Sequence, residues 1–247
     1  MAMYEFQERV RYSETDERGR MTLLSVLNAL QDCSTFHLKD VGLSVEELRK
    51  QGRSWLLSAW DIRILRLPEL YESITIGTSP HSFHGILAHR NFWIKDSREC
   101  FLLRAESEWF SLDTERMRPA RVKAEVLTPF GEMRDVLHLP ELVRRILLPD
   151  QLHDGGSFPV MRQQIDSNHH VNNAQYIALS LELLQDSPEG FPAFSRGRIR
   201  AEYQKAARFG DLLCARYGER DGKRIVSIQN PEGEVFCNVE IGEDPEA

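Results

Sequence analysis

Tyr12-Ser-Glu-Thr-Asp-Glu-Arg-Gly-Arg-Met21 and Gln163-Gln-Ile-Asp-Ser-Asn-His-His-Val171 are the two stretches that decide the fold of this 247-residue chain. When the second is laid over the first, Asp16 falls on Asp166 and Met21 falls on Val171. A similar pattern at two places in one chain indicates two copies of one structural unit. The rest of the sequence can therefore be interpreted outward from these two points.

A helical pattern follows each stretch. After the first, Leu23, Val26, Leu27 and Leu30 recur at the three-and-four spacing of a helix with one buried face. After the second, the segment 174–184 contains few polar residues, so we expect a helix that is buried on most sides.

Four strand-like stretches follow each predicted helix. The first set is expected near residues 54–66, 72–79, 88–96 and 99–112, and the second near 196–206, 211–217, 224–229 and 234–241. Trp60, Ile62 and Ile64 alternate with Asp61 and Arg63, which is the period of a half-buried strand. Each copy thus combines one long helix with an antiparallel sheet.

We predict an α+β fold of two tandem hotdog repeats, in which a sheet wraps a long helix, because half-buried strands can cover an apolar helix in this way. The N-terminal repeat is assigned to residues 1–125 and the C-terminal repeat to 157–247. Residues 126–156, rich in proline and glycine, form a linker with a short helix expected near Glu141–Leu147. Two unrelated α+β domains are the alternative, but they do not explain the alignment of Asp16 with Asp166.

Composition restricts the function. A net charge of −7 argues against a nucleic-acid surface, and no apolar run approaches the roughly 18 residues of a membrane span. The N-terminus has no signal-peptide pattern, and four widely spaced cysteines indicate reduced thiols, so we expect a cytoplasmic protein. Two arginine clusters are interpreted as solvated faces, with docking of an acidic protein as the alternative: Arg116, Arg118, Arg121 and Lys123, and Arg196, Arg198 and Arg200.

The densest polar segment precedes the second helix. Alternation in an extended chain would place Asp166, Asn168 and His170 on one face, and Asn172 or Asn173 is a good N-cap. The N–H groups of a helix N-terminus are donors that a developing oxyanion needs. Together these groups suffice for acyl transfer, although turn formation and capping explain them equally well. The histidine spacings do not match a metal site and no GxSxG motif is present, so we expect neither a metal or other cofactor nor a serine nucleophile.

The stretch Asp166-x-Asn-x-His-Val-Asn-Asn-x-x-Tyr176 resembles the DxNxHVNNxxY signature of the acyl-carrier-protein thioesterases, which are double-hotdog enzymes. Three further segments are similar to that family: Arg53-x-Trp-x-Leu-x-x-Trp60-x-Ile62, Trp109 leading into Arg116, and Glu202-Tyr203. The resemblance implies hydrolysis of fatty acyl-acyl-carrier-protein to free fatty acid and carrier protein, which ends or diverts fatty acid synthesis. It implies acyl carrier protein as partner and leaves a homodimer open.

One departure from the family pattern concerns the expected mechanism. Ala206 and Ala207 stand where plant-type members have a Glu and a Cys with a catalytic part, and Glu202 is four residues away from Ala206. We therefore expect Asp166 to act as base or nucleophile, Asn168 to orient the carboxylate or the water, and His170 to protonate the leaving thiolate. Helix N–H groups near Val171 and Asn172 would hold the oxyanion.

The first repeat lacks these partners, because Arg18 and Arg20 replace the amide and the imidazole. We expect it to hold the acyl tail, with Leu27, Leu30, Trp60 and Ile62 in the lining or simply in the core. Two rival functions remain: hydrolysis of acyl-coenzyme A or aryl thioesters by the same fold, and acyl binding without catalysis.

Overall fold

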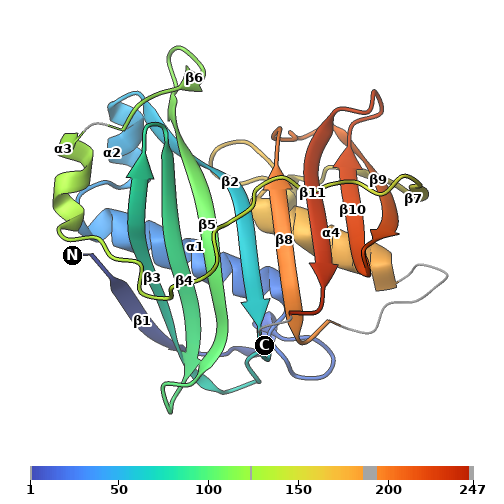
Figure 1. Ribbon diagram of the computed structural model, residues 1–247, viewed down its shortest axis with the longest axis horizontal. Coiled ribbons are helices and arrows are strands. Elements are labelled where there is room, and N and C mark those ends of the chain that lie inside the picture. The colour runs from blue at the N-terminus through green and yellow to red at the C-terminus, as the bar shows by residue number, and fades with distance from the viewer. Residues whose placement is uncertain (1, 123, 186–193, 245–247) are drawn as a thin grey trace.

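The computed structural model describes residues 2–122, 124–185 and 194–244. Within these residues the chain forms an 11-stranded antiparallel sheet, with both long helices on one face and the linker crossing the other (Figure 1). The strand order is β1-β3-β4-β5-β2-β8-β11-β10-β9-β7, and β6 pairs with β5 at the side. The predicted α+β double-hotdog fold is confirmed.

The first repeat contains the predicted long helix and the four strands after it, a short strand at the start where the sequence is strand-like, and further short elements that the sequence did not indicate. Its elements are β1 (Tyr4–Arg9), η1 (Tyr12–Glu14), α1 (Leu23–Asp40), α2 (Val45–Lys50), β2 (Arg53–Ile64), β3 (Ser73–His84), β4 (Leu87–Asp96), β5 (Phe101–Asp113) and β6 (Arg118–Pro119). Thr22 caps α1 by accepting the Ser25 N–H, as expected of a threonine at this position. Val26 and Leu30 are fully buried against the sheet.

The second repeat follows the same order. It consists of β7 (His153–Pro159), η3 (Arg162–Gln164), α4 (Asn173–Gln185), β8 (Gly197–Tyr203), β9 (Leu212–Arg220), β10 (Lys223–Gln229) and β11 (Val235–Gly242). β7 begins inside the segment that the sequence assigned to the linker, and it pairs with β9. Tyr176, Ile177 and Leu184 of α4 are fully buried.

The two repeats join through their central strands. β2 and β8 pair from Ala59 opposite Glu202 to Ile64 opposite Gly197. Across this seam the Arg198 Nε donates to Asp61 Oδ1 at 2.7 Å, and Asp61 is 3% exposed. The seam therefore makes one continuous sheet from two units.

The linker differs from its prediction. The expected helix at Glu141–Leu147 is wrong: helical turns occur earlier, in α3 (Ala124–Leu127) and η2 (Thr128–Phe130), and residues 140–149 have no helix. Here the outer face of the sheet binds the extended backbone, because Arg200 donates to the Val143 and Arg145 carbonyls. The Ile146 N–H donates to Glu202 at 3.0 Å. These bonds replace those that a helix would have made within itself.

Among the described residues, no helix is long and apolar enough to cross a membrane.

Candidate active site

The segment Asp166–Val171 is a tight loop at the start of α4. The Asp166 N–H donates to the His170 carbonyl at 2.8 Å, and the Asp166 Oδ1 accepts the N–H groups of Asn168 at 2.8 Å and His170 at 3.4 Å. His169 takes the left-handed conformation, with φ 62°. The prediction of an extended segment with three side chains on one face is therefore wrong, because the carboxylate of Asp166 folds the chain back on itself.

The first repeat contains the same loop. The Asp16 Oδ1 accepts the N–H groups of Arg18 and Arg20, both at 2.9 Å, and the Asp16 N–H donates to the Arg20 carbonyl. Gly19, with φ 70°, occupies the position of His169. The same three hydrogen bonds form in both loops, which confirms the alignment of Asp16 with Asp166. In each loop, one carboxylate holds the turn.

His170 is the half-buried imidazole of the second loop. Its pKa is lowered from the ordinary value of 6.5, first because burial disfavours the charged ring and second because Arg208 is near, while Asp166 partly opposes both effects. Within the described part of the chain, no hydrogen bond is made by the His170 ring. The neutral imidazole is therefore free to exchange a proton with a bound molecule.

The expected oxyanion donors are already used by the protein. The Val171 N–H donates to the Ala207 carbonyl, and the Asn172 N–H donates to the Gln164 carbonyl, each at 2.9 Å. These two N–H groups close the loop, so the oxyanion donor predicted near Val171 and Asn172 has to be a neighbouring N–H group. The predicted cap is confirmed, since the Asn172 Oδ1 accepts the Ala174 N–H at 2.9 Å. In the described residues the Asn173 N–H, at the start of α4, has no protein acceptor.

Ala206 and Ala207 lie beside this loop. Ala207 is fully buried, and its N–H donates to the Tyr176 hydroxyl at 3.0 Å. β8 supplies no acid or thiol in place of these two alanines. Its Glu202 is directed to the outer face of the sheet, where the carboxylate accepts the Ile146 N–H. The distant buried cysteines supply no thiolate either: burial raises the pKa of Cys33 to about 12 and raises that of Cys237 well above its ordinary value.

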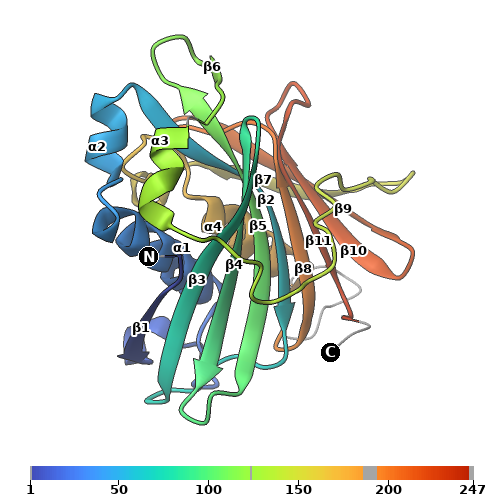
Figure 2. The same cartoon turned by 60° about the vertical axis from the view of Figure 1, so that its left-hand side comes forward.

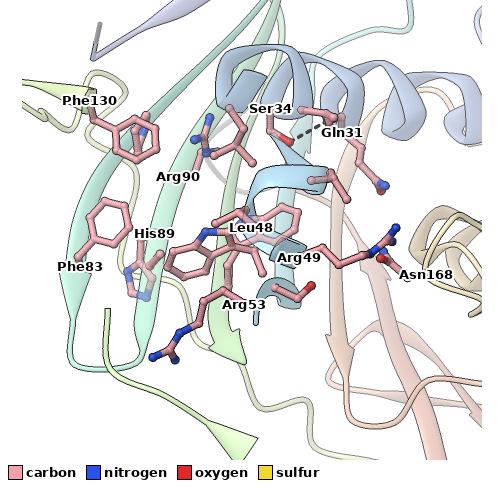
Figure 3. A pocket seen from close by; sticks show the side chains of 18 of the residues that line it. Gln31, Ser34, Leu48, Arg49, Arg53, Phe83, His89, Arg90, Phe130 and Asn168 are labelled. Carbon is pink, nitrogen blue, oxygen red and sulfur yellow. Dashed lines mark hydrogen bonds between the residues drawn. The ribbon is translucent and has the colours of Figure 1, made fainter. Parts of the chain in front are cut away.

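The first repeat contains a pocket of about 1050 Å³, counted with its open mouth, and the Asp166 loop of the second repeat lies next to it. Asn168 borders it, and the Arg49 Nη2 of α2 donates to the Ser167 carbonyl at 3.4 Å. Figure 3 shows Asn168 on one side of the pocket and Phe83 and Phe130 on the other. The second repeat thus places a polar side chain at the mouth of a pocket built by the first.

The residues that line this pocket differ from those expected to hold the acyl tail. Leu27, Leu30, Trp60 and Ile62 belong to the main hydrophobic core, and none of them borders the pocket. The pocket lies beyond them, against the later turns of α1, and borders a second apolar cluster around α2 and η2. Aromatic side chains from two strand ends and from the linker contribute to its lining, and no pattern in the sequence had singled them out as pocket residues: Trp55, Phe83 and Phe130.

The two arginine clusters differ in their surroundings. Arg198 pairs with Asp61 and Arg200 pairs with Glu240, so the second cluster is largely engaged within the protein. Arg116, on the turn after β5, Arg118, at the start of β6, and Arg121, after β6, are exposed, while Lys123 lies outside the described residues. Of the two clusters, as far as the structure describes them, the first is therefore the one whose guanidinium groups are available to a partner.

Comparison with known proteins agrees with this geometry. Residues 2–130 match the family model described as acyl-ACP thioesterase N-terminal domain, and residues 151–242 match the acyl-ACP thioesterase C-terminal domain. The chain belongs to the acyl-ACP thioesterase family. The boundary between the two matched domains falls within the linker, and the loop of Asp166 lies in the C-terminal domain.

Relatives with curated names are similar to this chain at low sequence identity. Oleoyl-acyl carrier protein thioesterase 2, chloroplastic, of Arabidopsis thaliana is 27% identical over 190 residues, which cover 70% of this chain and 52% of the relative. The dodecanoyl-[acyl-carrier-protein] hydrolase, chloroplastic, of Cinnamomum camphora is 22% identical over 83% of this chain and 56% of its own length. The chain thus spans about half the length of the curated relatives it matches.

Two solved structures share the whole fold. An acyl-ACP thioesterase from Bacteroides thetaiotaomicron superposes with a TM-score of 0.82 at 22% identity, covering 97% of each chain. The 12:0-ACP thioesterase from Umbellularia californica gives a TM-score of 0.82 at 18% identity, covering 98% of this chain and 97% of its own. At these identities the likeness establishes the double-hotdog fold.

Proposed function

We propose that this chain hydrolyses the thioester of fatty acyl groups carried by acyl carrier protein, with Asp166, Asn168 and His170 as the catalytic residues. The observation that carries the proposal is the contact between the two repeats at Asn168, which borders the apolar pocket from the loop that also holds His170. An acyl chain in the pocket would then place its thioester beside a neutral imidazole. Family membership over both repeats supports the same reaction.

In the proposed mechanism, water is the nucleophile. His170 replaces Asp166, the residue expected from the sequence, as the base, because the Asp166 Oδ1 already accepts two N–H groups of the loop. The neutral His170 accepts a proton from water as the oxygen attacks the thioester carbonyl, and the tetrahedral intermediate expels the thiolate. His170 then returns the proton to sulfur, so that the products are the fatty acid and the carrier thiol. Asp166 stabilises the transient imidazolium, in agreement with the direction of its effect on the His170 pKa. The Asn168 amide orients the water.

The carrier protein is proposed as the acyl donor because of the charge beside the pocket. Thr114 lines the pocket, and the exposed Arg116 and Arg118 follow it, on the same turn and at the start of β6. An acidic partner docked there would be held by interactions that salt weakens. Acyl-coenzyme A carries its own phosphates but no large acidic surface, so its Michaelis constant should depend less on salt.

The experiment is release of free fatty acid from a ladder of acyl-carrier-protein thioesters, with matching acyl-coenzyme A thioesters measured alongside at two salt concentrations. We expect faster release from the carrier-linked series, with a Michaelis constant that rises with salt for that series alone. In R116Q/R118Q this salt dependence should shrink while kcat is kept. As a matched control, R220Q changes an arginine of the β9–β10 hairpin in the second repeat.

Three results would contradict parts of the proposal. Release from coenzyme A alone would keep the mechanism and replace the partner. Release from neither series, together with tight binding of a fatty acid, would make the chain an acyl-binding protein. Full turnover in both D166N and H170A would refute the assigned residues.

A further inference from the structure

One of the residues that line the pocket comes from the linker. Phe130, the last residue of η2, lies in the interior of the first repeat and is 2% exposed, although much of the linker crosses the outer face of the sheet. Figure 2 shows the neighbouring α3 between α2 and β3, at the open edge of this repeat. A linker side chain therefore enters the space between α1 and the sheet.

Phe130 is held there by three contacts. Its ring meets His37 of α1 edge-on at 5.5 Å between centroids and lies 6.1 Å from the ring of Phe83 in β3. The guanidinium carbon of Arg90 is 6.0 Å from the centre of the Phe130 ring. Arg90 is itself fixed, because its Nη1 donates to Thr78 Oγ1 at 3.1 Å and meets His37 Nδ1 at 3.2 Å. The ring is thus held from three different elements.

The surroundings of Phe130 are separate from the main core. Phe130, Leu43 and Leu48 form a small buried cluster of their own, with Trp55 and Phe83 packed against it. Phe130, Phe83 and Leu48 also line the pocket. An acyl chain that enters beside Asn168 would cross the pocket and meet these rings on the far side (Figure 3).

We propose that Phe130 is the end wall of the acyl pocket and sets the longest chain that the enzyme accepts. This inference rests on the proposed function and adds a specificity-determining residue from the linker to it. Removing the ring would continue the pocket, and each further methylene that becomes buried would raise kcat/KM about fourfold. Enlarging the ring would shorten the pocket and shift the preferred chain length downward.

The test compares Phe130→Ala and Phe130→Trp with the unaltered chain on one ladder of saturated acyl-carrier-protein thioesters. We expect the preferred length to increase in Phe130→Ala and to decrease in Phe130→Trp. Loss of stability alone would lower all rates together, so opposite shifts of the maximum distinguish an end wall from a packing residue. The melting temperature of each variant is measured in parallel.

Leu43→Ala provides the matched control. Leu43 belongs to the same buried cluster but does not line the pocket, so its truncation should leave the preferred length unchanged. An unmoved maximum in both folded Phe130 variants would overturn the inference while the proposed function stands. Absence of hydrolysis for every thioester in the unaltered chain would instead refute the proposed function.

Discussion

At the scale of single residues, the loop hydrogen bonds of Asp166 can be separated from its proposed catalytic role. Its Oδ1 closes the loop by accepting two N–H groups, and Asp16 does the same in a repeat that has neither the amide nor the imidazole. The loop alone therefore explains why both repeats contain an aspartate. Because the two aspartates accept the same hydrogen bonds, they form a natural pair for comparison.

Replacing each aspartate by asparagine keeps an Oδ1 acceptor for the loop and removes the charge. We expect D166N to lower kcat/KM by roughly 10²-fold, a typical loss for a group that assists proton transfer, and D16N to leave it unchanged. Steady-state hydrolysis of an acyl thioester measures both. Equal losses in the two variants would show that Asp166 acts through the loop alone.

The lowered pKa of His170 predicts the pH dependence of the reaction. In the proposed mechanism the neutral ring is the active form, so kcat/KM should hold near neutrality and decline as the pH falls through a pKa below 6.5. In R208Q this limb should move to higher pH, because Arg208 is one of the charges that lower the pKa. A pH–rate profile tests both statements, and a limb above pH 6.5 in the unaltered chain would contradict them.

At the scale of elements, the linker is held to the sheet by buried polar side chains. Asn91 of β4 is fully buried, its Oδ1 accepts the N–H groups of Val136 and Leu137, and its Nδ2 donates to Glu106 at 2.5 Å. Such bonds explain how a proline-rich segment is ordered without regular secondary structure. They also hold the linker just beyond Phe130.

Truncating Asn91 should release this part of the linker. We expect N91A to lower the free energy of unfolding by about 2 kcal/mol, because buried partners lose their hydrogen bonds, and to speed proteolytic cleavage between residues 131 and 149. Urea denaturation and limited proteolysis measure the two effects. N28A is the control, since Asn28 is half-buried in α1 and makes no side-chain hydrogen bond among the described residues. Unchanged cleavage in N91A would contradict this role.

At the scale of the whole molecule, the two repeats depend on one seam. The β2–β8 ladder and the Asp61–Arg198 pair connect two halves whose sheets would each otherwise end in an open edge. The pocket lies mainly in the first repeat and the proposed catalytic loop lies in the second, so we expect activity to need the seam intact.

Removing one partner of this pair leaves the other charge half-buried. D61A should lower the free energy of unfolding by about 2–3 kcal/mol, below the range for fully buried pairs because the Arg198 side chain is 22% exposed. K205A breaks the exposed Lys205–Glu234 pair and should cost no more than about 1 kcal/mol. Urea denaturation compares the two variants. Equal losses of unfolding free energy would show that the seam pair stabilises the protein no more than an exposed ion pair does.

The sequence by itself determined the repeat, the two long helices and the eight strands that follow them, because apolar periodicity and the aspartate-containing turns are local properties of the chain. It also indicated Asp166, Asn168 and His170 as the densest polar segment and Asn172 as a cap, but it predicted an extended segment where the Asp166 carboxylate closes a tight loop. The linker helix was mispredicted because the outer face of the sheet, which binds that backbone, is not visible in the local pattern.

Only the tertiary structure decided where the pocket lies and which N–H groups are free. Phe83, Phe130 and Asn168 come from a strand end, the linker and the second repeat, and no spacing in the sequence relates them. The Val171 and Asn172 N–H groups are engaged by Ala207 and Gln164, of which Ala207 follows a different strand. Long-range packing places such groups together, and one sequence carries no local signal for it.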